Sequence, residues 1–312
     1  MHDSLMPYFE SALMPGAGLE KLLPPNLSPL RLALAPPNEQ IRIAIGPMME
    51  TAGRIGRLTH DLHVALASNP TDTAFAPERY TLHYQKQISH GMRRRLDFSL
   101  LQLLETQPLL EAPLQIKLDA IQRRRPLMES LFKQLEQKLF HAYRIREHGD
   151  YHLGQLLIDE RGEWWIIDFE GQPLRPLSER RIKRSPLRDV ASMLWSFYIC
   201  VHSMADKHIA NLLPGPDKST LNQIADVWCR WVSAAFLRAY FTAAHELDPH
   251  HPAGFHRIHD AALLLDCFFL DQGLEKIERD IARNGHPDEL SLSGLQFWLE
   301  SLTTEFPKTN KP

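Results

Sequence analysis

The chain has 312 residues, a formal net charge of −3 and an apolar content of 44%. This length suits one large domain or two modest ones, and the apolar share is ordinary for a globular protein with a sizeable core. The charge excludes a general attraction to nucleic acid or to an anionic membrane, so we expect neither as a partner. Basic runs at 93–95, 123–125 and 180–184 are interpreted as solvated helix faces or loops.

The cysteine pattern and the absence of targeting patterns concern the compartment. Cys200, Cys229 and Cys267 lie in apolar, helix-like surroundings without metal-ligand spacing, which indicates buried thiols in a reducing compartment. No apolar run of about 18 residues occurs, and the first residues lack a basic region followed by an apolar one. We therefore expect a cytoplasmic protein without a spanning helix.

In chain order, residues 1–40 are rich in Pro and Gly and predict loop structure. Residues 41–45 alternate like a short strand, and Pro47 then opens a helix that ends near Ser68. Further helices are predicted at 88–107, at 112–140 with a kink or restart at Pro126, after Ser185-Pro186, at 218–246 and at 255–284.

A β-hairpin is predicted between these helical regions. Residues 156–158 and 164–167 are apolar and flank the turn 159–162, which ends in glycine. The two tryptophans of the second strand indicate core and edge packing rather than a sugar-binding platform.

Polar residues frame this hairpin. The segment His148–Gln155 precedes it, and Asp168–Gly171 follows it. One interpretation makes His148, Asp150 and His152 ligands of a transition metal, because alternate residues of an extended backbone share a face.

A second interpretation makes Asp150 a general base and directs Gln155 toward a metal held by Asp168. A third takes the residues as a polar turn of no special chemistry. The transition-metal interpretation requires further ligands at short spacing. His60 and His63 stand at i and i+3 of a predicted helix, but we favour a partly buried His63 and an exposed His60.

Segments 148–155 and 167–173 resemble the catalytic and metal-binding loops of aminoglycoside-phosphotransferase-like kinases, and most of all those of maltokinases. Segments 58–68, 74–78 and 176–191 resemble maltokinases in the same order. The resemblance runs from about residue 45 to residue 200 and is weaker from 255 to 295.

The fold that this resemblance implies is α+β and mostly α-helical: a protein-kinase-like C-lobe with a small catalytic β-hairpin and an N-lobe that is largely absent. Residues 1–45 would be a remnant of the small lobe or hinge. Residues 46–308 would form the C-lobe, with catalytic loops at 148–155 and 168–173.

The resemblance also implies residue roles. Asp150 would accept the proton of a sugar hydroxyl as it attacks the γ-phosphate of ATP, and Gln155 and Asp168 would hold Mg²⁺. His152 and Glu170 would lie near the sugar.

Three further residues would support the site. They are His148, Arg188 and Asp189, of which the last two precede an apolar helix. Asp189 could cap that helix and brace the catalytic loop by hydrogen bonds.

The implied function is Mg-ATP-dependent phosphorylation of a sugar hydroxyl, on a maltose-like substrate in trehalose or glycogen metabolism. Gly16-Ala17-Gly18 with Lys21 lacks the flanking strands of a phosphate loop, and the helix at 270–279 lacks the tyrosines of maltokinases. The chain could be a truncated form, or a form completed by a trehalose synthase or small-lobe partner chain. A noncatalytic pseudokinase, or a regulator that binds carbohydrate or nucleotide, is the alternative.

Overall fold

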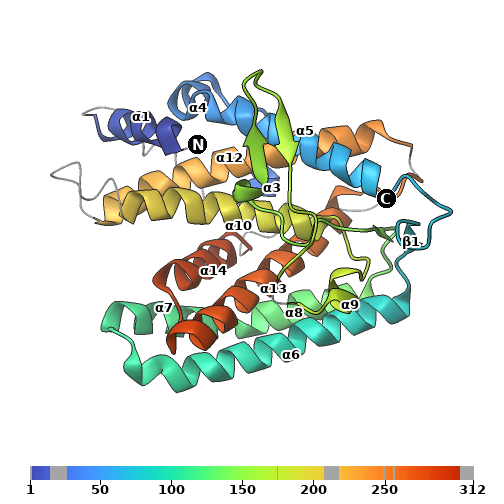
Figure 1. Cartoon of the computed structure of the whole chain (residues 1–312). Coiled ribbons are helices and arrows are strands. Elements are labelled where there is room, and N and C mark those ends of the chain that lie inside the picture. The colour runs from blue at the N-terminus through green and yellow to red at the C-terminus, as the bar shows by residue number, and fades with distance from the viewer. Residues whose placement is uncertain are drawn as a thin grey trace, which may run out of the picture.

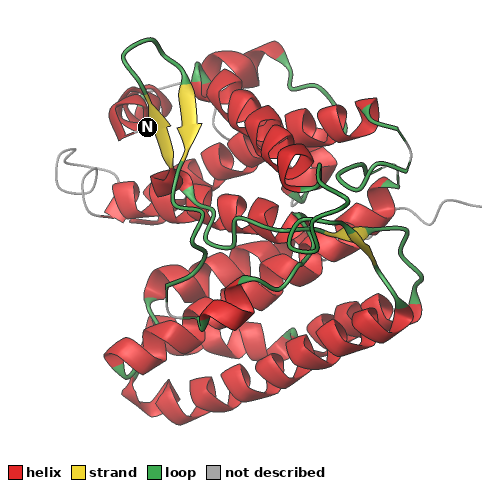
Figure 2. Ribbon diagram, turned by 45° about the vertical axis from the view of Figure 1, so that its right-hand side comes forward, coloured by secondary structure: helices red, strands yellow, loops and turns green. Residues whose placement is uncertain are grey.

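The computed structural model describes residues 2–14, 27–173, 175–206, 218–248, 250–255 and 257–302. This part of the chain is mostly helical, as the sequence predicted, and contains two small antiparallel sheets (Figure 1; Figure 2). The sequence predicted only one of these sheets, the hairpin of residues 156–158 and 164–167. The α-helices are α1 (His2–Leu13), α3 (Pro29–Ala33), α4 (Glu39–Ile45), α5 (Met48–Leu66), α6 (Leu82–Thr106), α7 (Ala112–Arg123), α8 (Arg125–Gln137), α9 (Leu177–Arg180), α10 (Leu187–Met204), α12 (Lys218–Glu246), α13 (Ile258–Asn284) and α14 (Glu289–Leu302). The strands are β1 (Glu78–Arg79), β2 (Tyr143–Arg144), β3 (Leu156–Ile158) and β4 (Trp164–Ile166).

The predicted strand at 41–45 is wrong, because these residues form helix α4. The Asn38 side chain caps the helix by accepting a hydrogen bond from the Ile41 backbone N–H at 2.9 Å. Ile41 and Ile45 are buried, whereas Ile43 is 73% exposed. Burial therefore repeats every fourth residue, which is the helical period, and the alternation of isoleucines in the sequence is misleading.

The predicted loop at residues 1–40 is wrong for most of its described part, which forms helices α1 and α3 and packs against α12. The Tyr8 hydroxyl donates a hydrogen bond to the Ile224 carbonyl at 2.8 Å, and Arg238 Nε donates to the Ala33 carbonyl at 3.0 Å. Residues 15–26, which include most of the Pro- and Gly-rich stretch and Lys21, lie outside the described residues. The assignment of this segment as a small-lobe remnant stays a prediction.

Helices α5 and α12 lie side by side in the upper half of the molecule (Figure 1). Gly56 makes this approach possible, since a Cβ there would lie 2.3 Å from the Phe236 carbonyl oxygen. Helix α10 packs on both α12 and α13, and α13 in turn contacts α6, α8 and α14. One continuous core joins all of these helices.

The structure confirms several smaller expectations. Pro126 lies in the first turn of α8, so the predicted restart is real. Cys229 and Cys267 are buried and Cys200 is partly buried, and none of the three is in a disulfide. No described helix combines the length and the apolarity that a bilayer crossing requires.

Two expectations about polar side chains are wrong. His60 is buried rather than exposed, with its ring edge-on to Tyr240. The basic runs are only partly solvated: Arg95 forms an ion pair with Asp271 at 2.6 Å, and Lys183 is buried. The carboxylates that attract these cations come from distant segments, which a local charge pattern cannot show.

The predicted hairpin forms as strands β3 and β4 (Figure 1; Figure 2). Leu156 pairs with Ile166 and Ile158 with Trp164. Trp164 packs against the core, whereas Trp165 is exposed and donates its indole N–H to Asp159. Large apolar side chains of the hairpin and the residues after it are 37–59% exposed: Leu157, Ile158, Trp165, Ile167 and Phe169.

Candidate active site

Asp189, in the first turn of α10, holds the loop that carries the histidine–aspartate motif. Its carboxylate is buried and accepts hydrogen bonds from the backbone N–H groups of His148 at 2.8 Å and Gly149 at 3.0 Å. On the other side it lies 3.3 Å from Nε2 of His63, a residue of α5. The residue before α10 is Pro186, which has no capping side chain, and the Asp189 carboxylate serves the loop.

Burial alone raises the pKa of Asp189. The hydrogen bond from His63, the charges of the nearby histidines and the Gly149 N–H act in the opposite direction, and they hold this pKa below its ordinary value. Asp189 is therefore a buried carboxylate that stays ionised at neutral pH and fixes the start of the loop.

The aromatic residues of the motif fix the rest of the loop. The His148 ring packs between Tyr151 and Phe169, at centroid distances of 5.3 and 5.1 Å. Its Nε2 lies 2.9 Å from the Ile167 carbonyl, which ties the loop to the end of the hairpin. The Tyr151 hydroxyl is 2.8 Å from Thr59 Oγ1 on α5.

The two residues predicted to hold a metal, Gln155 and Asp168, lie next to each other. Gln155 Nε2 is 3.1 Å from Asp168 Oδ2 and 3.3 Å from Nε2 of His152. Asp168 has a φ of 65°, and no other non-glycine among the described residues has a positive φ. Aspartate tolerates this left-handed conformation better than most residues, at a cost on the order of 1 kcal/mol.

This pair fits a hard divalent cation. A carboxylate and an amide supply the oxygen ligands that Mg²⁺ prefers, and rotation of the Gln155 amide would turn its oxygen toward the same point. Magnesium keeps several water or phosphate ligands, so two protein side chains are enough. The described residues contain no cluster of three or more histidine, cysteine, aspartate or glutamate side chains that could hold a metal, which gives the transition-metal interpretation no support.

A cavity of about 360 Å³ opens beside the loop. Asp150 and His152 line one side of it. Helix α10 supplies Arg188, Ser192 and Ser196 at steps of four residues, so they form a polar stripe on an otherwise apolar helix. Helix α13 supplies a second stripe: Gln272, Glu275, Lys276 and Arg279.

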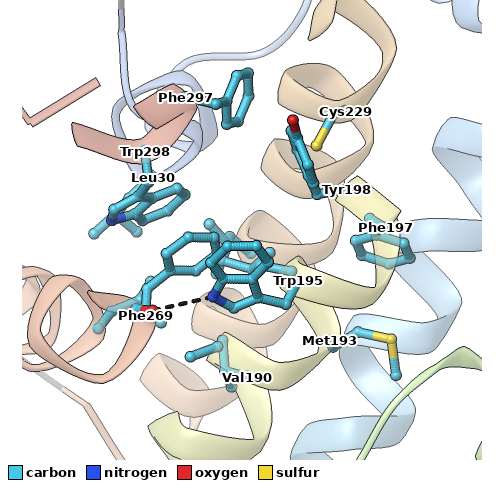
Figure 3. Packing of buried hydrophobic residues seen from close by; sticks show 14 of the residues in the cluster. Leu30, Val190, Met193, Trp195, Phe197, Tyr198, Cys229, Phe269, Phe297 and Trp298 are labelled. Carbon is cyan, nitrogen blue, oxygen red and sulfur yellow. Dashed lines mark hydrogen bonds between the residues drawn. The ribbon is translucent and has the colours of Figure 1, made fainter. Parts of the chain in front are cut away.

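Trp195 forms part of the cavity wall and is locked in place. Its ring stacks on Phe269 with centroids 4.6 Å apart, and its indole N–H donates to the Phe269 carbonyl at 3.0 Å (Figure 3). A Cβ at Gly273 or Gly294 would lie 2.7 or 2.4 Å from the ring, so both positions must be small. The cavity therefore has a rigid, preformed wall.

Ion pairs order two of the arginines near the cavity. Arg175 reaches both carboxylate oxygens of Glu275, at 2.6 and 2.8 Å. Arg188 lies 3.5 Å from Glu147, which also pairs with Arg184 at 3.1 Å. Burial raises the pKa of Glu275, but the charge and the hydrogen bonds of Arg175, together with the charges of Arg95 and Arg188, outweigh it and bring this pKa to about 2.

The structure thus brings together most of the residues that the sequence singled out. Asp150, His152 and Arg188 line the cavity, Gln155 lies beside His152, and Asp168 lies beside Gln155. Glu170 is exposed and is not among the residues that line this cavity. Arg188 and Asp189 lie inside α10 rather than before it.

Sequence reasoning missed several cavity residues of α10, notably Ser192, Trp195 and Ser196. The signal was present in the sequence, because two serines follow Arg188 at helical spacing within an apolar helix. The sequence alone does not show that the catalytic loop lies beside these serines. Without that information they look like polar residues that a buried helix simply tolerates.

No family model matches the chain. Over 201 residues it is 24% identical to a glucosamine kinase from Streptacidiphilus jiangxiensis, a match that covers 63% of this chain and 39% of that protein. It resembles a solved glucosamine kinase (crystal form A) with a TM-score of 0.61 and 20% identity, over 89% of this chain and 54% of the other. A glucosamine kinase in complex with glucosamine, ADP and inorganic phosphate gives a TM-score of 0.58 and 20% identity, over 88% and 59%.

These similarities show that the chain has the fold found in glucosamine kinases. They support the broader expectation of a sugar-kinase relative, while the narrower resemblance to maltokinases stays a prediction. The chain spans about 39% of the length of the curated relative that it matches.

Proposed function

We propose that this chain is the acceptor-binding and catalytic lobe of an ATP-dependent sugar kinase. The observation that carries the proposal is the position of Asp150, which lines the cavity together with His152. The His152 ring in turn lies 3.3 Å from Gln155, the neighbour of Asp168. A similar protein is named a glucosamine kinase, and a similar structure holds glucosamine, ADP and phosphate. Both names support a sugar as a substrate, and the ADP in the second supports a nucleotide.

The proposed chemistry is transfer of the γ-phosphoryl group to a sugar hydroxyl. Asp150 would accept the hydroxyl proton as the sugar oxygen attacks phosphorus, and the bond to ADP breaks. Gln155 and Asp168 would hold Mg²⁺, which when bound neutralises charge on the phosphates. His152 would contact the sugar from the cavity wall, and Glu170 would do so only if the sugar extends beyond the cavity.

Asp189 and His148 would act as positioning residues, because each fixes the loop without lining the cavity. The Asp189 carboxylate orders two successive backbone N–H groups just before Asp150. The same bonds would orient the Asp150 carboxylate toward the reacting hydroxyl.

The nucleotide would be held on the hairpin side. The exposed apolar residues of the hairpin and of the segment after it, among them Trp165 and Phe169, remain uncovered by the described part of residues 1–45. Such a surface suits a small lobe that is supplied by another segment or by a partner chain, for which a trehalose synthase is one candidate.

The acceptor is proposed to be a sugar of the size of a hexose or a disaccharide. The resemblance in the loops favours a maltose-like glucoside in trehalose or glycogen metabolism, and a cytoplasmic location belongs to the same proposal. The curated relative raises glucosamine as a competitor.

Calorimetric titration of the purified chain with Mg-ATP, repeated with Asp168→Ala, tests the nucleotide half of the proposal. We expect binding that weakens at least about tenfold in the variant, because the metal loses a charged ligand. Asp97→Ala, which removes an exposed aspartate of α6, serves as the matched control. No binding to the wild type would contradict stand-alone kinase activity and favour either a kinase completed by a further lobe or a noncatalytic regulator.

Phosphoryl transfer to sugar acceptors tests the other half. Asp150→Asn should lower the rate by about 10²- to 10⁴-fold, which is the usual contribution of a general base. Its stability should stay close to that of the wild type, because Asp150 has no hydrogen-bonded side-chain partner among the described residues. A variant that keeps the wild-type rate would refute the assigned role.

A further inference from the structure

Two cations on α13, Lys276 and Arg279, line the acceptor cavity without a carboxylate partner. Among the described residues, no aspartate or glutamate oxygen lies within 4.0 Å of either side chain's nitrogen atoms. Lys276 Nζ lies 6.0 Å from the centre of the Trp195 ring, and Arg279 Nε has only the Glu275 carbonyl, at 3.4 Å. The arginines deeper in the wall differ, since Arg175 and Arg188 are paired.

The described residues of the wall carry an excess of positive charge. They include four cations but only two carboxylates, those of Asp150 and Glu275. Arg175 already engages Glu275 through two hydrogen bonds. Asp150 is then the remaining carboxylate, and in the proposed reaction it must accept the hydroxyl proton, so it is not free to pair with a charged substituent of the sugar.

The direction in which the pKa of Lys276 shifts agrees with an excess of positive charge in the cavity wall. Burial lowers the pKa of Lys276, and the positive charge of Arg279 lowers it further. The attraction of Asp280, Asp150 and Glu275 does not offset these two effects. A further cation in this cavity would face the same unfavourable environment.

We propose that Lys276 and Arg279 make the cavity select its acceptor by charge, so that it rejects protonated amino sugars and takes neutral or acidic ones. This inference rests on the proposed sugar-kinase function and narrows its substrate class. The ammonium group of an amino sugar would lose its hydrating water and lie beside the positive charges of Lys276 and Arg279. A hydroxyl in the same place would instead accept hydrogen bonds from these two side chains. The chain would therefore differ in acceptor from the glucosamine kinases that share its fold.

The test is a binding titration, followed by NMR, with three sugars of one ring size: glucose, glucosamine and glucuronate. At a pH of about 6 and low salt, we expect glucosamine to bind about tenfold more weakly than glucose, and glucuronate at least as tightly as glucose. Maltose belongs in the same series as the larger neutral acceptor. Binding is measured without ATP, so the result does not depend on the nucleotide site.

Lys276→Gln should bring the affinities for glucose and glucosamine to within about twofold of each other, and Arg279→Gln should move them in the same direction. Lys133→Gln, which removes an exposed lysine of α8, should leave the order unchanged. Two variants are used so that a folding defect in one of them does not decide the outcome.

Each outcome of the titration bears on the inference. Glucosamine that binds the wild type as tightly as glucose would overturn the selectivity and leave the proposed kinase function standing. An order that persists in both variants would overturn the role of these two residues. Failure of every sugar to bind would overturn the assignment of the cavity as an acceptor site and the inference with it.

Discussion

Asp189→Asn tests whether one buried carboxylate organises the catalytic loop. The substitution keeps the size of the side chain but replaces one acceptor oxygen by an NH₂ group. That group would face the backbone N–H of His148 or Gly149, which now lie 2.8 and 3.0 Å from the carboxylate. Loss of a charge-assisted hydrogen bond costs about 1.5–3 kcal/mol, and a buried unsatisfied donor adds about 1–3 kcal/mol. We therefore expect the free energy of unfolding to fall by about 3–5 kcal/mol.

Urea unfolding measures this loss, and amide hydrogen exchange locates it. Exchange of the His148 and Gly149 amides should accelerate far more than exchange in α12, because their acceptor is lost locally. Asp97→Asn is the matched control: it makes the same chemical change in an exposed pair with Arg125, where a loss below about 1 kcal/mol is expected. Equal costs for the two variants, or unchanged exchange at Gly149, would refute the reasoning.

Two further predictions concern packing and pH. Gly56→Ala should destabilise the protein by about 1–3 kcal/mol or more, because the added Cβ would lie 2.3 Å from the Phe236 carbonyl oxygen. The control is Gly91→Ala in α6, where an added Cβ meets nothing within 4 Å and should stabilise the protein by about 0.5–1 kcal/mol. Thermal unfolding distinguishes the loss of stability from the gain. Glu275→Gln should cost about 3 kcal/mol at pH 7, because Arg175, with Arg95 and Arg188, holds the pKa of Glu275 at about 2 in the folded state. A depressed pKa contributes stability at pH values above the unfolded-state pKa near 4.5, and that stability is lost as the pH falls toward 2. The difference in unfolding free energy between variant and wild type should therefore shrink in urea titrations at pH 4 and 3. A difference that stays constant with pH would contradict the ion-pair explanation.

The elements that the sequence predicted correctly are those fixed by local patterns. The hairpin follows from two short apolar runs around a turn that ends in glycine, and the restart of α8 follows from Pro126. The predicted start of α6 at residue 88 is too late, because the helix begins at Leu82, where the Thr81 hydroxyl caps it by accepting a hydrogen bond from the Tyr84 N–H. The strand prediction for residues 41–45 is wrong for a related reason. A run of five residues fits the helical and the strand period equally well, and only the Asn38 cap indicates the helix.

The site was predictable as a motif but not as a cavity. Asp150, Gln155 and Asp168 stand within 19 positions of one another around a hairpin, so their proximity follows from local structure. The cavity wall joins this loop to α10 and to residues of α13 more than a hundred positions away. Burial of His60 and the ion pair of Arg95 with Asp271 depend on equally distant partners, which periodicity and composition do not reveal.

Helix α10 joins the two halves of the proposed mechanism. Its first turn holds the catalytic loop through Asp189, its middle supplies Ser192 and Ser196 to the cavity, and Trp195 anchors it to α13. The acceptor side is thus built on packed helices within the described chain, whereas the hairpin side presents exposed apolar residues. If the nucleotide site needs a further lobe, sugar binding should survive in the isolated chain even where Mg-ATP binding is weak. Sugar binding and nucleotide binding would then be separable, and adding the missing lobe should strengthen only the second.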